Sequence, residues 1–362
     1  MRQISPPSCK ATYVYDICIN SISDNDLRTR LAGIRSYIED SEDDYHNHAR
    51  EQGFHEVSRN DCENHEVVHG GVSKKEMKDV YSAHMVPKRK PARLIYDAIL
   101  SGAPLGRCPF CGVGYVSTLD HYLPKESFPN LSVVPANLIP CCRDCNSEKG
   151  SSWPRNASDQ IIHPYYGARE FIVEQWLYAR IIDEGRLIVE YYVDPPSSWS
   201  PISTERVRRH FTTFKLAHRY AIEANNEIAA RKDGFDKYAA KCGFLALSDL
   251  LDSQHSTYRR QHVNSWQTAL YQELARHAHH TSDLNTIETC PRCTGRGVIA
   301  SNVCDACNGL GSAMKRHFLA LGDSVYRPAP CPKCVAGNPS CILCRGEGML
   351  SWGKAKAFDM DQ

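Results

Sequence analysis

Residues 108–150 read CPFCGVGYVSTLDHYLPKESFPNLSVVPANLIPCCRDCNSEKG, and this stretch decides how the rest of the chain is interpreted. It begins with one Cys-x-x-Cys pair and ends just after another, Cys108/Cys111 and Cys142/Cys145. Four thiolates satisfy tetrahedral Zn²⁺, and a site closed by four protein ligands is structural rather than catalytic. We therefore predict a zinc ion that clamps the two ends of a stretch with little core of its own. Cys141 could replace Cys142, but Cys142 restores the two-residue spacing to Cys145.

The residues between the cysteine pairs carry the groups that phosphodiester hydrolysis needs. They are Asp120, His121 and Asn137, with Asn146 directly after the last cysteine. Hydrolysis requires a base for water and a cation for the charge on the phosphate, so a histidine beside a carboxylate supplies the base and a cation ligand. Neighbouring strand side chains point to opposite faces, so we expect a bend or bulge to bring the two together. A nearby amide oxygen can complete a site for Mg²⁺ or Mn²⁺.

The order Asp-His, Asn-Leu, Cys-x-x-Cys-Asn-x-x-Lys-Gly resembles the HNH (ββα-metal) endonucleases of the zinc-stabilised kind. The resemblance covers about Arg107 to Tyr166, a minority of the chain. It implies a β-hairpin followed by a helix, with one catalytic divalent metal ion. It also implies that Asp120 and Asn146 are ligands of that ion and that His121 is the general base. Asn137 would hold the loop that presents His121.

The same resemblance suggests which cations contact the substrate. Lys149 of the Lys-Gly motif is a candidate for phosphate contact, and Lys125 and Arg143 are further candidates for substrate binding. His163, which lies downstream in the sequence His-Pro-Tyr-Tyr, is assigned a structural or substrate-contacting role rather than metal ligation. A basic cluster before the motif consists of Lys88, Arg89, Lys90 and Arg93. It fits either a charged helix start or phosphate contact, and its closeness to the site favours DNA.

A second cysteine-rich region occupies residues 288–350. It holds four further Cys-x-x-Cys pairs, Cys290/Cys293, Cys304/Cys307, Cys331/Cys334 and Cys341/Cys344. Three of the four match Cys-x-x-Cys-x-Gly-x-Gly, which resembles the zinc module of DnaJ-type chaperones. Glycines after each pair let the chain turn with positive φ. By that analogy the first and fourth pairs share one zinc ion and the second and third share another.

The third repeat departs from this pattern, reading Val-Ala-Gly-Asn after its cysteines, so pairing between adjacent repeats stays open. With the zinc ion predicted between Cys108 and Cys145, the chain would hold about three. The His-Pro-Asp tripeptide of a J-domain is absent, so the module does not imply chaperone activity. We expect it to grip a partner protein or nucleic acid, or to have a purely structural role.

Composition narrows the class of protein. Of 17 cysteines, 12 fall in the six pairs, and because zinc-binding thiolates must stay reduced we expect a cytoplasmic protein. Basic and acidic residues number 43 and 42, so nucleic-acid binding must depend on local patches. No apolar run approaches the ~18 residues of a membrane span, so no membrane partner is expected.

We predict an α+β fold that is mainly helical. A helical N-terminal region (1–106) would precede the HNH core (107–166), followed by a β-hairpin and helical domain (167–287), the zinc module (288–350) and a tail (351–362). Apolar spacing predicts a helix over about 24–39, followed by an acidic run with a solvated face. The sequence Ser-Lys-Lys-Glu at Ser73 has the spacing of a helix capping box. We also expect a hairpin over 171–193 and helices over 202–280.

The resulting hypothesis is a metal-dependent HNH endonuclease that hydrolyses DNA, such as an antiviral defence or restriction-type effector. The alternatives are a non-catalytic zinc protein that binds nucleic acid and an adaptor that binds protein through residues 290–348. A partner such as an ATPase, contacted through the zinc module or the helical regions, is a further hypothesis. The assignment to defence rests on association, because a fold does not by itself define a function.

Overall fold

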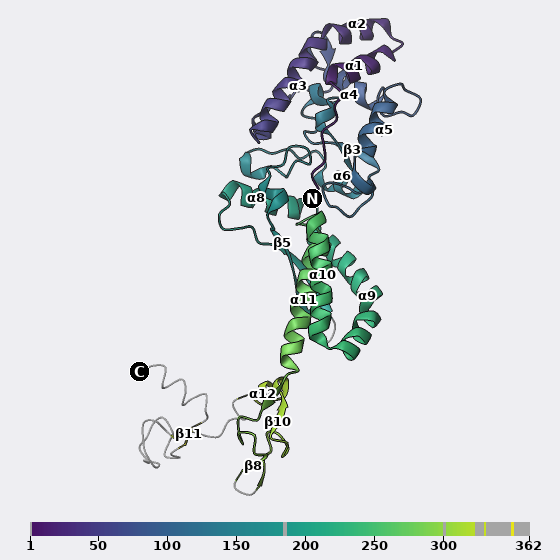
Figure 1. Cartoon of the computed structure of the whole chain (residues 1–362). Coiled ribbons are helices and arrows are strands. Elements are labelled where there is room, and N and C mark those ends of the chain that lie inside the picture. Colours follow the sequence, from purple (N-terminus) through teal and green to yellow (C-terminus); the bar gives the residue numbers. More distant parts are fainter. Residues whose placement is uncertain (1, 184–186, 300–301, 323–328, 331–348, 351–362) are drawn as a thin grey trace. The chain divides into compact units, whose positions relative to one another are not determined.

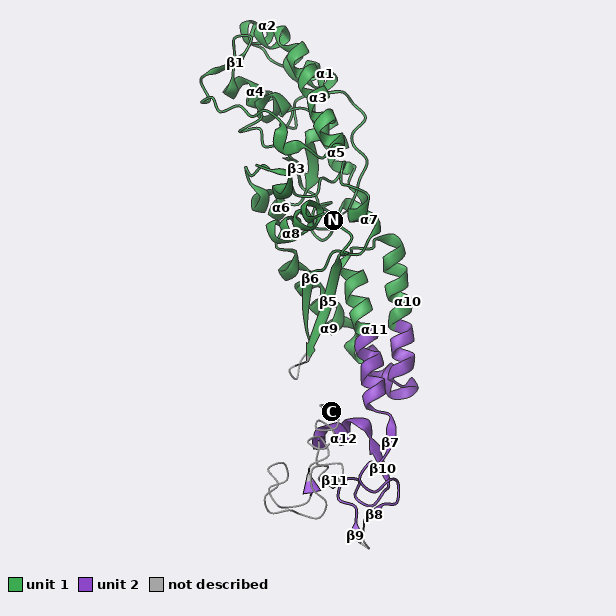
Figure 2. Ribbon diagram, turned by 90° about the vertical axis from the view of Figure 1, so that its left-hand side faces the viewer, with its two compact units in different colours: residues 1–233, 251–274 green, residues 234–250, 275–362 purple. Residues whose placement is uncertain are grey.

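The computed structural model describes residues 2–183, 187–299, 302–322, 329–330 and 349–350 (Figure 1). The chain divides into two compact units, residues 1–233 with 251–274, and residues 234–250 with 275–362 (Figure 2). The divisions between the units, after residues 233, 250 and 274, all fall within helices. The described residues are mainly helical with small two-stranded sheets, which is the mainly helical α+β class predicted.

The N-terminal region contains α1 (Ala11–Asn20), α2 (Asn25–Gly33), α3 (Arg35–Arg50) and the short helix η1 (Phe54–Glu56). The single helix expected over 24–39 is therefore two helices, separated at Ile34, whose φ of −103° and ψ of 14° leave the helical region. The acidic run lies inside α3 instead of after it. Glu42 of this run is buried and accepts a hydrogen bond from Ala11 N at 2.8 Å, so this carboxylate is not part of a solvated face.

The strands β1 (Val67–His69) and β2 (Val72–Ser73) form a small hairpin that leads into α4 (Lys74–Ser82). The predicted capping box is present, since the Ser73 side chain accepts from Glu76 N and the Glu76 carboxylate accepts from Ser73 N. Next come α5 (Arg93–Ser101) and η2 (Pro104–Gly106). Helix α5 packs against the strands of the motif region.

In the motif region the order of elements is strand, strand, helix. Strand β3 (Thr118–His121) pairs antiparallel with β4 (Leu138–Cys141), and α6 (Arg143–Lys149) follows. The connection between the strands contains η3 (Pro129–Leu131) and η4 (Pro135–Asn137). The pairing runs without interruption from Thr118↔Cys141 to His121↔Leu138, so the bulge expected at Asp120 and His121 is not there.

Two short helices, η5 (Ala157–Asp159) and α7 (Glu170–Val173), lead to the hairpin of β5 (Leu177–Asp183) and β6 (Leu187–Val193). The hairpin thus begins later than the sequence suggested. The helices that follow are α8 (Pro201–Thr213), α9 (Leu216–Cys242), α10 (Phe244–Gln261) and α11 (Trp266–Leu284). Phe214, Leu216 and Tyr220 are buried, whereas Ile222 is 47% exposed.

The second unit ends in small paired strands. Strand β7 (Ile287–Thr289) pairs with β10 (Ser312–Met314), β8 (Val298–Ile299) with β9 (Asn302–Val303), and β11 (Ala329–Pro330) with β12 (Met349–Leu350). Helix α12 (Lys315–Leu321) follows β10. Among the helices of the described residues, none combines the length and apolar character needed to cross a bilayer.

Candidate metal centres and candidate catalytic cavity

The first metal centre joins the start of the motif region to its helix. Four sulfur atoms lie within 4.8 Å of one another, and all four residues are buried, namely Cys108, Cys111, Cys142 and Cys145. This is the predicted set, and Cys142 rather than Cys141 belongs to it. Four thiolates at such spacing could hold a structural zinc ion.

Backbone amides and one glycine shape this centre. Gly114 N donates to Cys111 Sγ at 3.4 Å, and Cys145 N donates to Cys142 Sγ at 3.5 Å. A Cβ atom on Gly114 would lie 2.7 Å from the Cβ of Cys142, so a larger residue here would push the two cysteine pairs apart. These contacts bring donors to the sulfur atoms, which orients metal ligands and moderates their charge.

Helices α8 and α9 hold the first cysteine pair from outside, which the sequence did not reveal. His210 is fully buried and its Nε2 donates to the carbonyl of Phe110 at 2.9 Å. Tyr220 donates its hydroxyl to the carbonyl of Cys111 at 2.9 Å. Burial lowers the pKa of His210 to about 3, so the ring is neutral. Arg219 also places Nη1 4.0 Å from Cys142 Sγ.

A cavity of about 300 Å³ lies beside β3 and α6. Its lining brings together four of the predicted site residues, Asp120, His121, Lys125 and Asn146. The other lining residues are Tyr81, Val86, Tyr96, Thr118 and Leu119. Asp120 and His121 thus reach one cavity although their strand is regular, because His121 is the last residue of β3. Arg143 is exposed and is not among the lining residues.

The hydrogen bonds of His121 define its tautomer. Nε2 lies 2.8 Å from the carbonyl oxygen of Ser132, which can only accept, so Nε2 carries the proton in the neutral ring. Nδ1 then keeps its lone pair. Burial lowers the pKa of His121 to about 3, and the ring packs edge-on against Tyr81 at 4.4 Å between centroids. The side chain is therefore a fixed, neutral imidazole with Nδ1 as its acceptor.

Asp120 lies against Lys149 in a buried ion pair. The carboxylate Oδ2 is 3.1 Å from Lys149 Nζ, and apart from this pair it has no hydrogen-bond partner among the described residues. Burial raises the pKa of the Asp120 carboxyl, and the Lys149 charge opposes that effect. Lys149 also donates to the carbonyl of His121 at 2.6 Å and is only 3% exposed. Its ammonium is committed to these contacts.

Asn137 is fully buried and organises the loop that follows His121. Its side-chain oxygen accepts from Leu123 N at 2.8 Å, and its amide donates to Leu123 O at 2.9 Å and to Leu131 O at 3.2 Å. These contacts lie on the segment that carries Ser132, the partner of His121. Asn137 does not line the cavity, so any effect it has on the site is indirect.

His163 is held inside the protein by both ring nitrogens. Nδ1 accepts from Tyr165 N at 3.0 Å, and Nε2 lies 2.9 Å from the Tyr45 hydroxyl. The ring also stacks on Phe54. With both nitrogens used, the contacts are those of a structural histidine.

The second metal centre brings together two adjacent repeats. Its four buried sulfur ligands come from the first and second repeats, Cys290, Cys293, Cys304 and Cys307. This cluster has the pairing between adjacent repeats that the sequence left open, and not the analogy's pairing of Cys290 and Cys293 with Cys341 and Cys344, and of Cys304 and Cys307 with Cys331 and Cys334. Adjacent repeats close locally, since β8 and β9 are near each other in the sequence and pair directly, so bringing them together has little entropic cost. The cysteines of the third and fourth repeats lie outside the described residues.

The glycines of the two repeats explain how they fit together. Cys290 N donates to Gly311 O and Cys304 N donates to Gly297 O, each at 2.8 Å. Gly297 N and Gly311 N donate to the second sulfur of their own repeats at 3.2 Å. Both glycines have positive φ, and a Cβ atom would lie 2.2 Å from Gly309 O or 2.3 Å from Gly295 O. Only glycine allows the two repeats to approach this closely.

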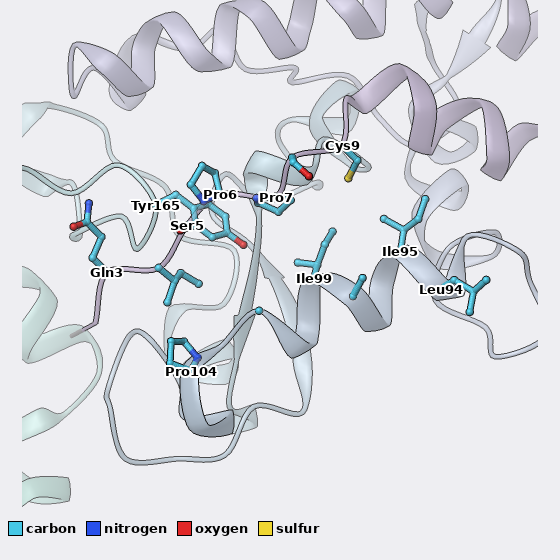
Figure 3. A pocket seen from close by; sticks show the side chains of 14 residues that line it. Gln3, Ser5, Pro6, Pro7, Cys9, Leu94, Ile95, Ile99, Pro104 and Tyr165 are labelled. Carbon is cyan, nitrogen blue, oxygen red and sulfur yellow. The ribbon is translucent and has the colours of Figure 1, made fainter. Parts of the chain in front are cut away.

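A larger groove of about 950 Å³ lies elsewhere in the first unit, between the N-terminal segment and α5. Figure 3 shows Pro6, Pro7 and Cys9 along one part of it and Ile95 and Ile99 along another. Its lining contains no acidic, basic or histidine side chain. The groove therefore lacks the groups that hydrolysis or hard-metal binding needs, and the smaller cavity remains the candidate site.

The fold and the two centres define a mainly helical α+β protein with two four-cysteine clusters that could hold structural zinc. The chain is 33% identical to protein ea31 of Escherichia phage lambda over 221 residues, which are 58% of this chain and 74% of the phage protein. It belongs to the family of that protein. Over 46 residues it is 41% identical to Septu protein PtuB of Bacillus thuringiensis, covering 13% of this chain and 17% of that protein. No protein-family model matches the sequence, and no solved structure matches it.

Proposed function

We propose that the protein is a metal-dependent endonuclease of the HNH kind that hydrolyses phosphodiester bonds in DNA. The observation that carries this proposal is His121, a neutral imidazole with its free Nδ1, which lines one cavity with Asp120 and Asn146. The order of β3, β4 and α6 around that cavity is the strand, strand, helix order that the sequence resemblance implies. The zinc clamp ties α6 to the start of the motif region and so stabilises this arrangement.

The donor set of the cavity fits a hard divalent cation. Asp120 lines the cavity with a carboxylate whose Oδ2 has Lys149 Nζ, at 3.1 Å, as its partner among the described residues, and Asn146 offers an amide oxygen. Mg²⁺ and Mn²⁺ prefer such oxygen ligands and keep several waters, so two protein ligands suffice. The buried thiolates select zinc instead, which separates the structural centres from the catalytic one.

His121 acts in this reaction as the general base. Nδ1 removes a proton from a water molecule as the water oxygen attacks phosphorus, while the bond from phosphorus to the leaving sugar oxygen breaks. The hydrogen bond from Nε2–H to Ser132 O holds the ring and favours the imidazolium that forms. A cation held by Asp120 and Asn146 would supply positive charge at the scissile phosphate. Asn137 orders the loop that positions the Ser132 carbonyl.

We propose further that this nuclease acts in defence against phage, and the short similarity to Septu protein PtuB supports that role. The match covers too little of either chain to carry over partners. A partner protein would bind this chain at the second metal centre or on the helices.

The proposal is tested by incubating the full-length protein with supercoiled plasmid in the presence of Mg²⁺ or Mn²⁺. We expect nicked or linear plasmid, and no product after a chelator removes the divalent cation. Metal-dependent DNA binding without cleavage, at any protein concentration that saturates the plasmid, would contradict the proposal. That result would favour a non-catalytic adaptor.

A further inference from the structure

The segment between α4 and α5 contains a tight turn, Pro87–Lys90, in which Lys90 N donates to Pro87 O at 3.0 Å. Lys88 and Arg89 occupy its two central positions. Just before it, Val86 N donates to Tyr81 O at 3.1 Å, which ties the turn to the end of α4. We refer to Pro87–Lys90 as the basic turn.

Lys90, the last residue of the basic turn, and Arg93, which follows it, make hydrogen bonds that hold the turn in place. Lys90 donates from Nζ to the Ser21 carbonyl at 2.9 Å. Arg93 donates from Nη1 to the Val86 carbonyl at 2.6 Å, and its guanidinium lies 4.4 Å from the centre of the Tyr96 ring. These bonds fix the backbone of the turn at both ends. The basic cluster seen in the sequence therefore has two members with structural contacts.

The other two members, Lys88 and Arg89, are exposed. Within the ranges that the structure describes, neither side chain makes an ion pair or a hydrogen bond. Long cationic side chains on a braced backbone suit phosphate, because the guanidinium can bind two oxygens at once and the ammonium acts as a point charge. Since the backbone is already fixed, binding orders little beyond the two side chains.

The basic turn lies next to the candidate catalytic cavity. Val86 and Tyr96, on either side of it in the sequence, both line the cavity that holds Asp120 and His121. Lys125 lines the same cavity, with its side chain 24% exposed and Nζ 3.3 Å from a Glu126 carboxylate oxygen. The cavity is therefore lined by one cation, Lys125, and by two residues that flank the basic turn in the sequence.

We propose that the basic turn binds the phosphate backbone of the DNA strand whose scissile phosphate reaches His121. This inference rests on the proposed function and adds the surface that holds the substrate. The formal net charge of the chain is only +1, so affinity for DNA must come from such local groups. Each phosphate neutralised by a cation releases counterions and adds about 0.9 to the dependence of log K on log salt concentration.

The test measures binding of a fluorescent DNA duplex to full-length protein carrying His121→Ala, in Mg²⁺ and over a series of salt concentrations. The variant Lys88→Ala/Arg89→Ala is compared with a matched control, Lys10→Ala/Arg208→Ala, which removes two exposed cations that do not line the cavity. We expect the basic-turn variant to bind about tenfold or more weakly at 0.1 M salt, with a slope lower by about 1 to 2. Lys88→Arg/Arg89→Lys should retain most of the affinity.

Equal affinity and equal slope in the basic-turn variant and the control would overturn the inference. The plasmid assay separates this failure from that of the proposed function. If wild-type protein cuts plasmid but the basic-turn variant binds like the control, the inference alone fails. If wild-type protein does not cut but the basic-turn variant loses affinity and slope, the phosphate-binding surface stands without the nuclease. Thermal unfolding of both double variants checks that the exposed substitutions leave the fold intact.

Discussion

At the scale of single residues, Lys149 links α6 to Asp120 and His121, the two candidate site residues of β3. Its ammonium is buried between the Asp120 carboxylate and the His121 carbonyl. The Lys-Gly motif suggested a residue that contacts phosphate, because sequence shows the residue type but not the direction of the side chain. Phosphate contact by Lys149 stays a prediction, and the contacts with Asp120 and the His121 carbonyl point to a residue that positions the site.

Lys149→Met should destabilise the fold. Removing one partner of a buried ion pair leaves the Asp120 charge uncompensated, which costs about 3–5 kcal/mol. Urea unfolding measures the change. Lys75→Met is the control, because its partner Asp79 and the pair itself are at the surface, and its unfolding midpoint should stay close to wild type. A Lys149→Met protein as stable as this control would contradict the structural role.

The effects of Asp120→Ala and Asn146→Ala on cleavage should differ from the effect of His121→Ala, which removes the proposed base. Each substitution removes an oxygen ligand for the divalent cation, so the defect should be weaker metal binding. We expect cleavage by both variants to recover in part as Mg²⁺ or Mn²⁺ is raised, whereas His121→Ala should not recover. Titration of cleavage rate against metal concentration measures this, and identical metal dependence in wild type and both variants would exclude these residues as ligands.

At the scale of elements, the sequence located helix starts better than helix breaks. The capping box at Ser73 could be recognised because it depends on local spacing, and it is present. The break at Ile34 could not, because Leu27, Leu31, Ile34 and Ile38 keep helical spacing through it. Asp120 and His121 were expected to need a bulge, but the position of His121 at the strand end makes one unnecessary.

The start of α4 should lose stability in acid through Glu76. The Arg30 guanidinium lowers the pKa of Glu76 from 4.5 to about 2, so the stabilisation is present above pH 4.5 and is lost as pH falls towards 2. Glu76→Gln can keep the capping hydrogen bond but not the charge. We expect it to cost on the order of 1 kcal/mol at pH 7, since solvent screens the pair. Urea unfolding should show the difference from wild type shrinking below pH 4.5, and a constant difference down to pH 2 would contradict this.

At the scale of the whole molecule, the cysteine spacing predicted all four members of the first cysteine cluster, but for the second it predicted a cluster without its members. The first depended on four residues of one motif. The second depended on how repeats fold onto one another, and an analogy with another module could not show that adjacent repeats close the site. The contacts of His210, Arg219 and Tyr220 with the first centre were also hidden, because they come from helices 77 to 109 residues away in the sequence.

Metal analysis of the purified protein should find about three zinc ions per chain, two of them in the four-cysteine clusters described here. The third stays a sequence prediction for Cys331, Cys334, Cys341 and Cys344. Cys145→Ser should lose one zinc ion and lower the melting temperature, because binding and folding free energy are coupled at such sites. Fewer than two zinc ions in wild type, or full zinc content in Cys145→Ser, would contradict the assignment.

The most direct test of the central claim is the rate of plasmid cleavage by His121→Ala, compared with wild type in Mg²⁺ and with contaminating nuclease excluded. A positioned base contributes roughly 10²–10⁴-fold in rate, so the variant should fall by about that factor. Zinc content and the far-UV circular dichroism spectrum should stay near wild type, because His121 belongs to neither cysteine cluster. The melting temperature should fall, because the substitution removes a buried ring and its hydrogen bond to Ser132 O. Cleavage by His121→Ala at the wild-type rate would show that this cavity is not the catalytic site.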